Sequence, residues 1–232
     1  MSDPTSTPAT PLSDFLRGSI WAANLGSDTL ARVESEVLER SVPGGGVVCR
    51  KGAPVDYWVG VIEGLVKISS VSAEGKSVTF TGVRAGGWFG EGSVLRTTAW
   101  GYDAVALRDC RVALMPRATF HWLLETSIEF NRFLLEQLNE RLSLFIGMLE
   151  SDRLLEPEAR VARCLASLFN PHLYPGSGRD LQISQEEIGY LSGVSRQRVN
   201  QALQVLGQAG LLRVAYGGVS VLDLQGLGRY GT

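Results

Sequence analysis

The sequence predicts an α+β chain that contains a β-roll, one long helix and a winged helix-turn-helix. Three observations predict it: short apolar runs punctuated by glycine at about 41–116, an almost unbroken helical pattern at about 128–154, and two short amphipathic segments within 184–206. We therefore expect four parts along the chain: a disordered tail at 1–13, the roll with flanking helices at 14–126, the long helix at 127–156 and the winged helix-turn-helix at 157–232.

The first forty residues give two weaker signals. Residues 1–13 are rich in Ser, Thr and Pro, a composition that buries too little apolar surface to fold, so we expect disorder. Within 28–39, Leu30, Val33 and Val37 recur at helical spacing, which predicts a helix with one apolar side.

The glycine-punctuated region reads as strands. Its apolar and β-branched runs predict strands at 57–62, 65–71, 77–83 and 104–107, with a hairpin turn at 73–76. Many short strands at regular spacing indicate an antiparallel roll of the double-stranded jelly-roll type. Such a shell is either filled by its own side chains or holds a small ligand.

The long helix carries an apolar seam. A shorter helix is expected before the long one, with Pro116 in its first turn. The seam residues are spaced 3, 4, 3 and 4 apart: Leu135, Leu138, Leu142, Phe145 and Leu149. A second apolar edge for packing on the roll is formed by Leu134, Leu144 and Met148. We therefore expect a parallel homodimer along the seam, the alternative being a core helix of a monomer.

Two helices follow with complementary start and stop signals. Ser184 and Glu187 form a capping box, and Gly193 ends the first helix. Ser195 caps the second helix, which exposes Arg196 and Arg198 between its apolar positions. This layout and a hairpin at about 211–222 predict a winged helix-turn-helix. The alternative is that the two arginines form a solvated basic face without a binding role.

Charge is distributed unevenly along a chain with a net charge of −2. Residues 1–156 contain 15 Lys and Arg against 19 Asp and Glu, and residues 157–232 contain 7 against 5, so the two parts carry −4 and +2. No acidic residue lies between Glu187 and Asp223, whereas three arginines do. Phosphate repulsion is thus lowest around the predicted helix-turn-helix, which favours nucleic acid as its partner.

Several other classes of protein are disfavoured. A secretory signal and a run of about 18 apolar residues are both missing, so we expect a cytoplasmic protein without membrane attachment. Three separated cysteines and the lone His121 and His172 form no ligand cluster, so no metal or cofactor is expected. A cupin-like enzyme would need histidine ligands on its strands, and the strand region contains none. We expect no enzyme.

The order of roll, long helix and winged helix-turn-helix resembles the Crp/Fnr (cyclic-AMP receptor protein) family of bacterial transcription regulators, over about residues 40–225. The glycines fall at the family's turn intervals of 12, 11, 11 and 4: Gly52, Gly64, Gly75, Gly86 and Gly90. Gly90 and Glu91 match the start of the family's phosphate-binding cassette. The resemblance implies a cyclic-nucleotide-binding-like roll and a DNA-reading helix.

The resemblance also implies roles for individual residues. The positions from which the family reads base edges are Arg196, Gln197 and Gln201. Arginine fits the acceptors of guanine and glutamine those of adenine. Phosphate contacts would come from Ser184, Ser195 and Arg198. Because the family commonly has Glu where this chain has Gln197, we expect a different operator.

The effector pocket departs from the family pattern. The family's phosphate-clamping Arg-Ser pair aligns with Gly101 and Tyr102, neither of which supplies a cation. Arg96 in the same loop is a weak substitute. The family's Thr-Ser pair toward adenine aligns with Phe145 and Ile146. We therefore expect that cyclic AMP does not bind in the usual way and leave the effector unknown, while Glu91 is either a remnant ligand or a turn residue bonded to backbone N–H groups.

These features together predict a homodimeric, sequence-specific transcription regulator. Its partners would be double-stranded DNA with a palindromic operator and, for an activator, RNA polymerase. One variant of this prediction is a regulator that acts without any small molecule, its pocket filled by side chains. The competing hypothesis is a ligand-sensing or protein-interaction module whose helix-turn-helix is only structural. A steep loss of DNA affinity with added salt distinguishes the regulator from that module.

Overall fold

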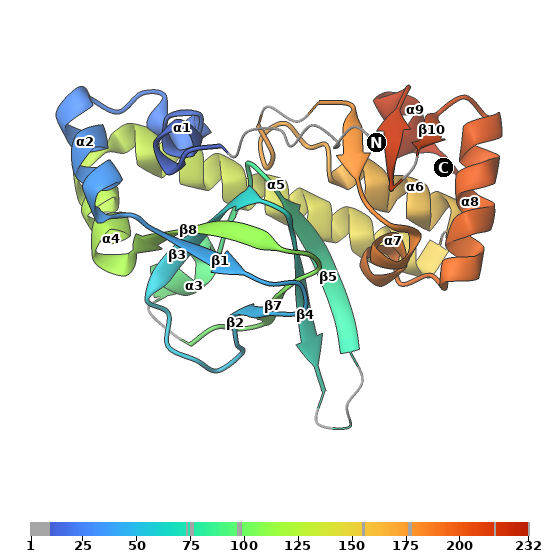
Figure 1. The fold of residues 1–232 in the computed structure, drawn as a ribbon, viewed down its shortest axis with the longest axis horizontal. Helices are drawn as coiled ribbons and strands as arrows, with labels where there is room; N and C mark the ends of the chain where they lie inside the picture. Colours follow the sequence, from blue (N-terminus) through green and yellow to red (C-terminus); the bar gives the residue numbers. More distant parts are fainter. Residues whose placement is uncertain are drawn as a thin grey trace, which may run out of the picture.

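The computed structural model describes residues 10–231 except 73, 75, 76, 97, 98, 155, 176, 177 and 216, and only the backbone of 148–154. Figure 1 shows the long helix α5 (Ile128–Leu154) running behind the roll from the N-terminal helices to the C-terminal domain. In the part of the chain described, no helix is long and apolar enough to cross a membrane.

The roll consists of two antiparallel sheets. One sheet has the order β1 (Leu38–Val42), β8 (Cys110–Pro116), β3 (Tyr57–Glu63) and β6 (Trp88–Phe89). The other has the order β2 (Val47–Cys49), β7 (Asp103–Ala106), β4 (Leu65–Val71) and β5 (Ser77–Arg84). The α+β fold with a roll, a long helix and a helix-turn-helix is thus as predicted.

An aromatic cluster joins the first sheet to the helices that cover it. Trp58 of β3 stacks on Trp88 of β6 with a centroid distance of 4.3 Å, and Trp21 and Phe130 pack edge-on around them. Because this sheet is covered on both faces, β3 is buried along almost its whole length. The cluster fixes the start of α5 against the roll.

The N-terminal helices correct two predictions. Helix α1 (Leu12–Arg17) and a 3-10 turn η1 (Ile20–Ala22) precede α2 (Ser27–Glu36). The predicted tail is therefore too long at residues 12 and 13, whereas residues 1–9 lie outside the described chain. The predicted helix at 28–39 is also too long, because Val37 is extended and β1 pairs with β8 from Leu38 onward. Sheet pairing overrides the helical periodicity there.

The roll strands agree with the four predicted runs, with one correction beside them. The predicted turn at 73–76 lies mostly outside the described residues, but β4 and β5 pair on both sides of it, from Leu65 with Arg84 to Val71 with Ser77. Pro116 is the N-cap of a helix and lies one residue before the predicted first-turn position. It ends β8 opposite Tyr57, and α4 (Arg117–Thr126) begins after it. Strand β8 itself and the short helix α3 (Glu91–Arg96) were not predicted individually.

Helix α5 has two apolar edges. Leu134 is buried and Leu144 packs against the roll core, as the second edge predicts. The opposite edge is open, since Leu135 and Leu142 are 68% and 59% exposed. The side chains of 148–154, which include the predicted seam residue Leu149, lie outside the description.

The C-terminal domain forms its own core between helices and a small sheet. Its helices are α6 (Pro157–Ser167), α7 (Gln185–Ser192), α8 (Arg196–Gln208) and α9 (Leu224–Arg229), and its sheet is β10 (Leu212–Ala215), β11 (Gly218–Val221) and β9 (Asp180–Gln182). The β10–β11 hairpin is the predicted wing, whereas α9 was not predicted. Leu65 of the roll is buried in this core, so the two domains share packing.

Candidate DNA interface and effector pocket

Helix α8 separates its side chains into a buried and an exposed face. Val199, Ala202, Leu203 and Leu206 are buried against the domain core. All of the predicted contact residues on this helix are exposed: Arg196, Gln197, Arg198 and Gln201. The structure therefore brings the predicted base-reading residues together on one open surface at the helix N-terminus, which is an end suited to phosphate oxygens.

Close contacts hold α7 and α8 in their relative orientation. Gly193 adopts φ +65°, the left-handed conformation that ends α7. A Cβ on Gly189 would lie 2.8 Å from the Val194 carbonyl oxygen, so only glycine allows the helices to approach this closely. Gln185 Nε2 donates to Asn200 Oδ1 at 3.1 Å across the pair. The rigid pairing is what lets α8 present a fixed row of side chains.

Both predicted phosphate-contacting serines act as helix caps. The Ser184 hydroxyl accepts from Glu187 N at 3.2 Å, and Ser184 N donates to Glu187 Oε2 at 2.6 Å, which confirms the capping box. Ser195 likewise accepts from Arg198 N. Each hydroxyl keeps its own hydrogen available to donate to an acceptor such as a phosphate oxygen.

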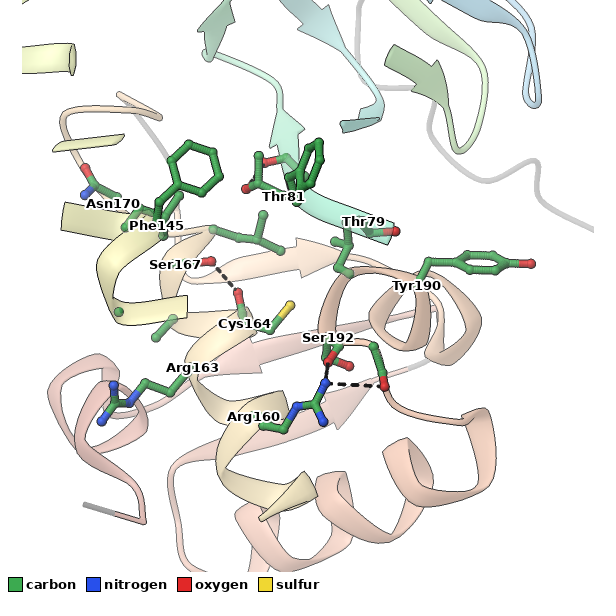
Figure 2. A pocket seen from close by; sticks show the side chains of 18 of the residues that line it. Thr79, Thr81, Phe145, Arg160, Arg163, Cys164, Ser167, Asn170, Tyr190 and Ser192 are labelled. Atoms are coloured by element: carbon green, nitrogen blue, oxygen red, sulfur yellow. Dashed lines mark hydrogen bonds between the residues drawn. The ribbon is translucent and has the colours of Figure 1, made fainter. Parts of the chain in front are cut away.

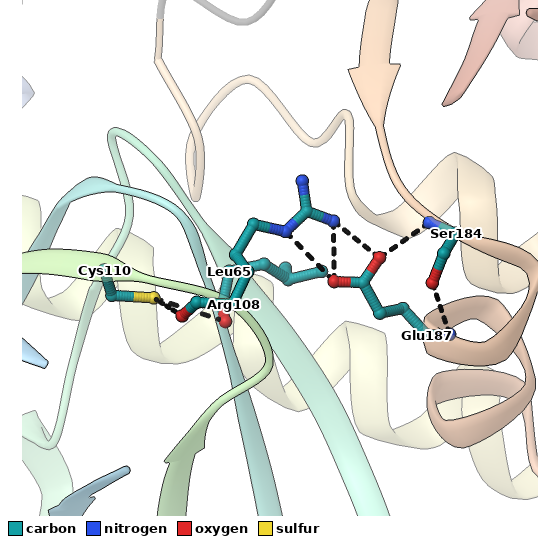
Figure 3. A network of polar contacts seen from close by, with 5 residues as sticks. All are labelled: Leu65, Arg108, Cys110, Ser184 and Glu187. Carbon is teal, nitrogen blue, oxygen red and sulfur yellow. Dashed lines mark hydrogen bonds and ion pairs between the residues drawn. The ribbon is translucent and has the colours of Figure 1, made fainter. Parts of the chain in front are cut away.

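The Glu187 carboxylate of α7 is paired with an arginine of the roll. Figure 3 shows Arg108, from the turn between β7 and β8, paired with Glu187 of α7. Arg108 Nη2 lies 2.6 Å from both carboxylate oxygens, and its Nε lies 3.0 Å from Oε1. The capping-box carboxylate thus does not present a free negative charge near α8, and the pair fixes α7 to the roll.

The predicted effector pocket is closed by aromatic side chains. Gly90 adopts φ +99°, and a Cβ there would lie 2.5 Å from the Trp100 ring. Trp100 is itself buried and lies 5.7 Å from the Tyr102 ring. Burial, together with the charge of Glu91, raises the pKa of Tyr102 above its ordinary value. Tyr102 therefore acts as a neutral filler of the space beside Gly90 and Glu91.

Glu91 is bound by an arginine of the long helix. It is 2% exposed, and Arg141 Nε of α5 donates to its Oε1 while Arg141 Nη2 donates to the Trp88 carbonyl. Burial lowers the pKa of Arg141, but Glu91, Tyr174 and Tyr102 together outweigh it, so the pKa lies above its ordinary value. Glu91 Oε2 is buried and has no hydrogen-bond partner among the described residues. Glu91 is therefore half of a buried ion pair, unlike the turn residue of the alternative interpretation.

The cations near the predicted phosphate position are engaged or exposed. The charge of Arg141 is already compensated by Glu91, and Gly101 is exposed and supplies no cation. Arg96 is exposed and its Nε donates to the Gly92 carbonyl within α3.

Two residues predicted for this pocket lie on the long helix. Phe145 and Ile146 are 39% and 50% exposed on α5, and Phe145 lines a cavity between the two domains. Around the predicted Gly90, Glu91 and Tyr102, the structure adds two contacts that the sequence did not indicate, Trp100 and Arg141.

The position of Arg141 on the roll-facing side of α5 could have been predicted from the helical spacing of its neighbours. Leu134, Gln137, Arg141 and Leu144 recur at spacings of 3, 4 and 3 and form the face of α5 against the roll. A buried arginine on an otherwise uncharged face requires an acidic partner, and Glu91 follows the glycine that opens the cassette. Helical periodicity could have identified the residue, but only the fold identifies its partner.

Comparison with known proteins decides the family. A model of the cyclic nucleotide-binding domain matches residues 39–127, and a model of the Crp-like helix-turn-helix domain matches 159–230. The transcriptional regulator LdrP of Thermus thermophilus is 34% identical over 173 residues, which cover 72% of this chain and 83% of LdrP. The chain belongs to the Crp/Fnr family of transcription regulators. Its relatives in this family are regulators and not enzymes, as expected.

Other members of the Crp/Fnr family show how far the likeness extends. The cAMP-activated global transcriptional regulator CRP of Haemophilus influenzae is 27% identical over 158 residues, 66% of this chain and 69% of that protein. The crystal structure of a Crp/Fnr regulator of Thermus thermophilus has a TM-score of 0.57 at 26% identity, covering 84% of this chain and 100% of the other. The roll of this chain thus shares its fold with a family that includes cAMP-activated members.

Proposed function

We propose that the chain works as a homodimer that reads a near-palindromic operator through α8. The observation that carries this proposal is the row of exposed Arg196, Gln197 and Gln201 at the start of a rigidly held helix. Guanidinium and amide groups at such positions match the acceptor and donor patterns of guanine and adenine in the major groove. Arg198 and the capping serines Ser184 and Ser195 would fix the register through phosphates.

A second copy would supply the other half-site. Leu135 and Leu142 are the most exposed members of the predicted seam, and Phe145 continues it along α5. Packing of two such edges buries apolar surface that one chain leaves in water. Two recognition helices held this way would meet half-sites about one helical turn, ~34 Å, apart. If the regulator is an activator, RNA polymerase is its further partner.

The roll in this proposal does not take cyclic AMP in the usual way. Trp100 and Tyr102 fill the space beside Gly90, and Arg141 and Glu91 neutralise each other. A side-chain ion pair between the roll and the dimer helix thereby occupies the place where a charged ligand would connect the two. This supports a regulator whose roll is closed without a nucleotide.

Substitution of two neighbouring arginines tests the reading of DNA. Arg196→Ala is expected to cost about 1–3 kcal/mol on the cognate operator and to relax specificity at one base pair per half-site. Arg198→Ala, the matched control, is expected to weaken binding to all sequences equally and to reduce the salt slope by about one. Titration of wild type and both variants against operator and scrambled duplexes distinguishes the two roles. Uniform weakening by Arg196→Ala would contradict the proposed base contact.

A further inference from the structure

A large cavity lies between the two domains, away from the roll pocket. Its volume is about 1190 Å³, and Figure 2 shows it between β5 with Thr79 and Thr81, α6 with Cys164, and α7 with Tyr190. Phe145 of α5 forms another wall. A space of this size exceeds the usual range of roughly 300–1,000 Å³ for small-molecule pockets.

The walls are mainly apolar. Side chains of Phe80, Leu144, Leu168 and Leu191 face the cavity from the roll, the long helix and the C-terminal domain. Burial raises the pKa of the Cys164 thiol to about 12, so it lines the cavity as an uncharged group. An apolar chain that entered the cavity would be removed from water on several sides.

The charged residues that line the cavity are all basic. Lys67 of β4 and Arg160 and Arg163 of α6 line it, and no Asp or Glu is found among its described lining residues. Arg160 is engaged, because its Nη2 donates to the Ser192 carbonyl at 3.0 Å. Arg163 Nε, in contrast, is buried without a hydrogen-bond partner among the described residues. A buried cationic donor of this kind favours an anionic acceptor.

From this combination we infer that the interdomain cavity is an effector site for an elongated amphiphile with a carboxylate head. The methylene chain would pack against the apolar walls, and the carboxylate would pair with Arg163. The ligand would touch β5 of the roll and α6 and α7 of the DNA-binding domain at the same time. Its affinity therefore depends on how the domains are placed, and by linkage its binding changes the affinity for DNA. This inference rests on the proposed DNA-binding function for its regulatory part only.

Calorimetric titration of the full-length protein with sodium laurate below its micelle concentration tests the site. Wild type is expected to bind laurate saturably, and the uncharged analogue dodecanol at least about tenfold more weakly. Cys164→Phe, which fills the cavity, is expected to weaken laurate binding by at least about tenfold, whereas Cys164→Ala keeps it. Arg163→Gln should weaken laurate but not dodecanol, and Arg117→Gln, on the exposed surface of α4, should change neither.

The possible results distinguish failure of the ligand site from failure of its regulatory role. The proposed site would be overturned if Cys164→Phe did not weaken laurate binding. It would also be overturned if the wild type did not bind laurate at all, which is the result expected if a second chain fills the cavity. Laurate that binds in the cavity but leaves the dissociation constant for operator DNA unchanged would overturn the regulatory role. Laurate binding is measured without DNA. Failure to find an operator would therefore count against the proposed function but would not affect the test of laurate binding.

Discussion

Replacing Arg141 by methionine is expected to destabilise the roll far more than a surface substitution does. The Arg141 side chain is 13% exposed and that of Glu91 is 3% exposed, so the carboxylate would be left buried with no cation beside it. Removing one partner of a buried ion pair costs about 3–5 kcal/mol, whereas replacing both partners by apolar or neutral groups of similar volume is often close to neutral. The double variant Arg141→Met with Glu91→Gln should therefore recover most of the loss.

Urea unfolding followed by tryptophan fluorescence measures this cycle. Trp58 and Trp88 are buried beside the pair and report on the roll. Arg132→Met, an exposed position on the same helix, is the matched control and should change the free energy of unfolding by no more than about 0.5 kcal/mol. All variants are compared at one protein concentration because association contributes to stability. A loss below about 1 kcal/mol for Arg141→Met, or additivity of the two single substitutions, would refute the buried pair.

Three further predictions follow from other contacts. Leu135→Glu with Leu142→Glu should convert the dimer to a monomer in sedimentation experiments, since both carboxylates would fall in the proposed interface. Burial raises the pKa of Cys49 from 9.0 to about 12, so its contribution to stability should be complete below pH 9 and be lost as the pH rises toward 12. Ser184→Ala should cost about 1 kcal/mol through the lost cap, and Arg108→Ala roughly 2 kcal/mol through the lost interdomain pair, both by urea unfolding.

The seam, the thiol and the domain contact each have a control. For the seam, Arg132→Glu on the exposed surface of α5 should leave the dimer intact, and a dimeric double-glutamate variant would contradict the seam. For the thiol, the stability difference between wild type and Cys49→Ala should narrow by up to about 1.4 kcal/mol per pH unit above pH 9, and a constant difference would exclude a raised pKa. For the domain contact, Arg117→Ala should be silent, and an equally silent Arg108→Ala would show that the pair does not hold α7.

The sequence predicts the elements whose signals are local. The bounds of α5 follow from a helical pattern interrupted only by Gly147. Helices α7 and α8 follow from Ser184, Gly193 and Ser195, because caps and left-handed glycines act within one helical turn. The end of α2 could not be predicted this way. Val37 continues the helical periodicity, but pairing of β1 with β8, more than seventy residues away, decides its conformation.

In the candidate site, too, the features formed within one helix could be predicted from the sequence, and the contacts between distant residues could not. The exposed row on α8 is readable because buried and exposed positions alternate within one helix. The pairs Glu91–Arg141 and Arg108–Glu187 join residues 50 and 79 positions apart, and the domain cavity is lined by residues of four helices and two strands. Only the fold brings such groups together. For that reason the alignment of Phe145 and Ile146 with the family's Thr-Ser pair did not indicate that Phe145 lines the interdomain cavity.

Selection of bound sequences from random double-stranded DNA, performed with the full-length protein alone and with added cyclic AMP, tests the central claim most directly. The account predicts one near-palindromic class of sequences, with half-sites one helical turn apart, enriched equally well with and without the nucleotide. Enrichment that requires cyclic AMP would contradict the closed pocket formed by Trp100, Tyr102 and the Glu91–Arg141 pair. Enrichment of no sequence class under either condition would contradict the proposed operator reading by α8.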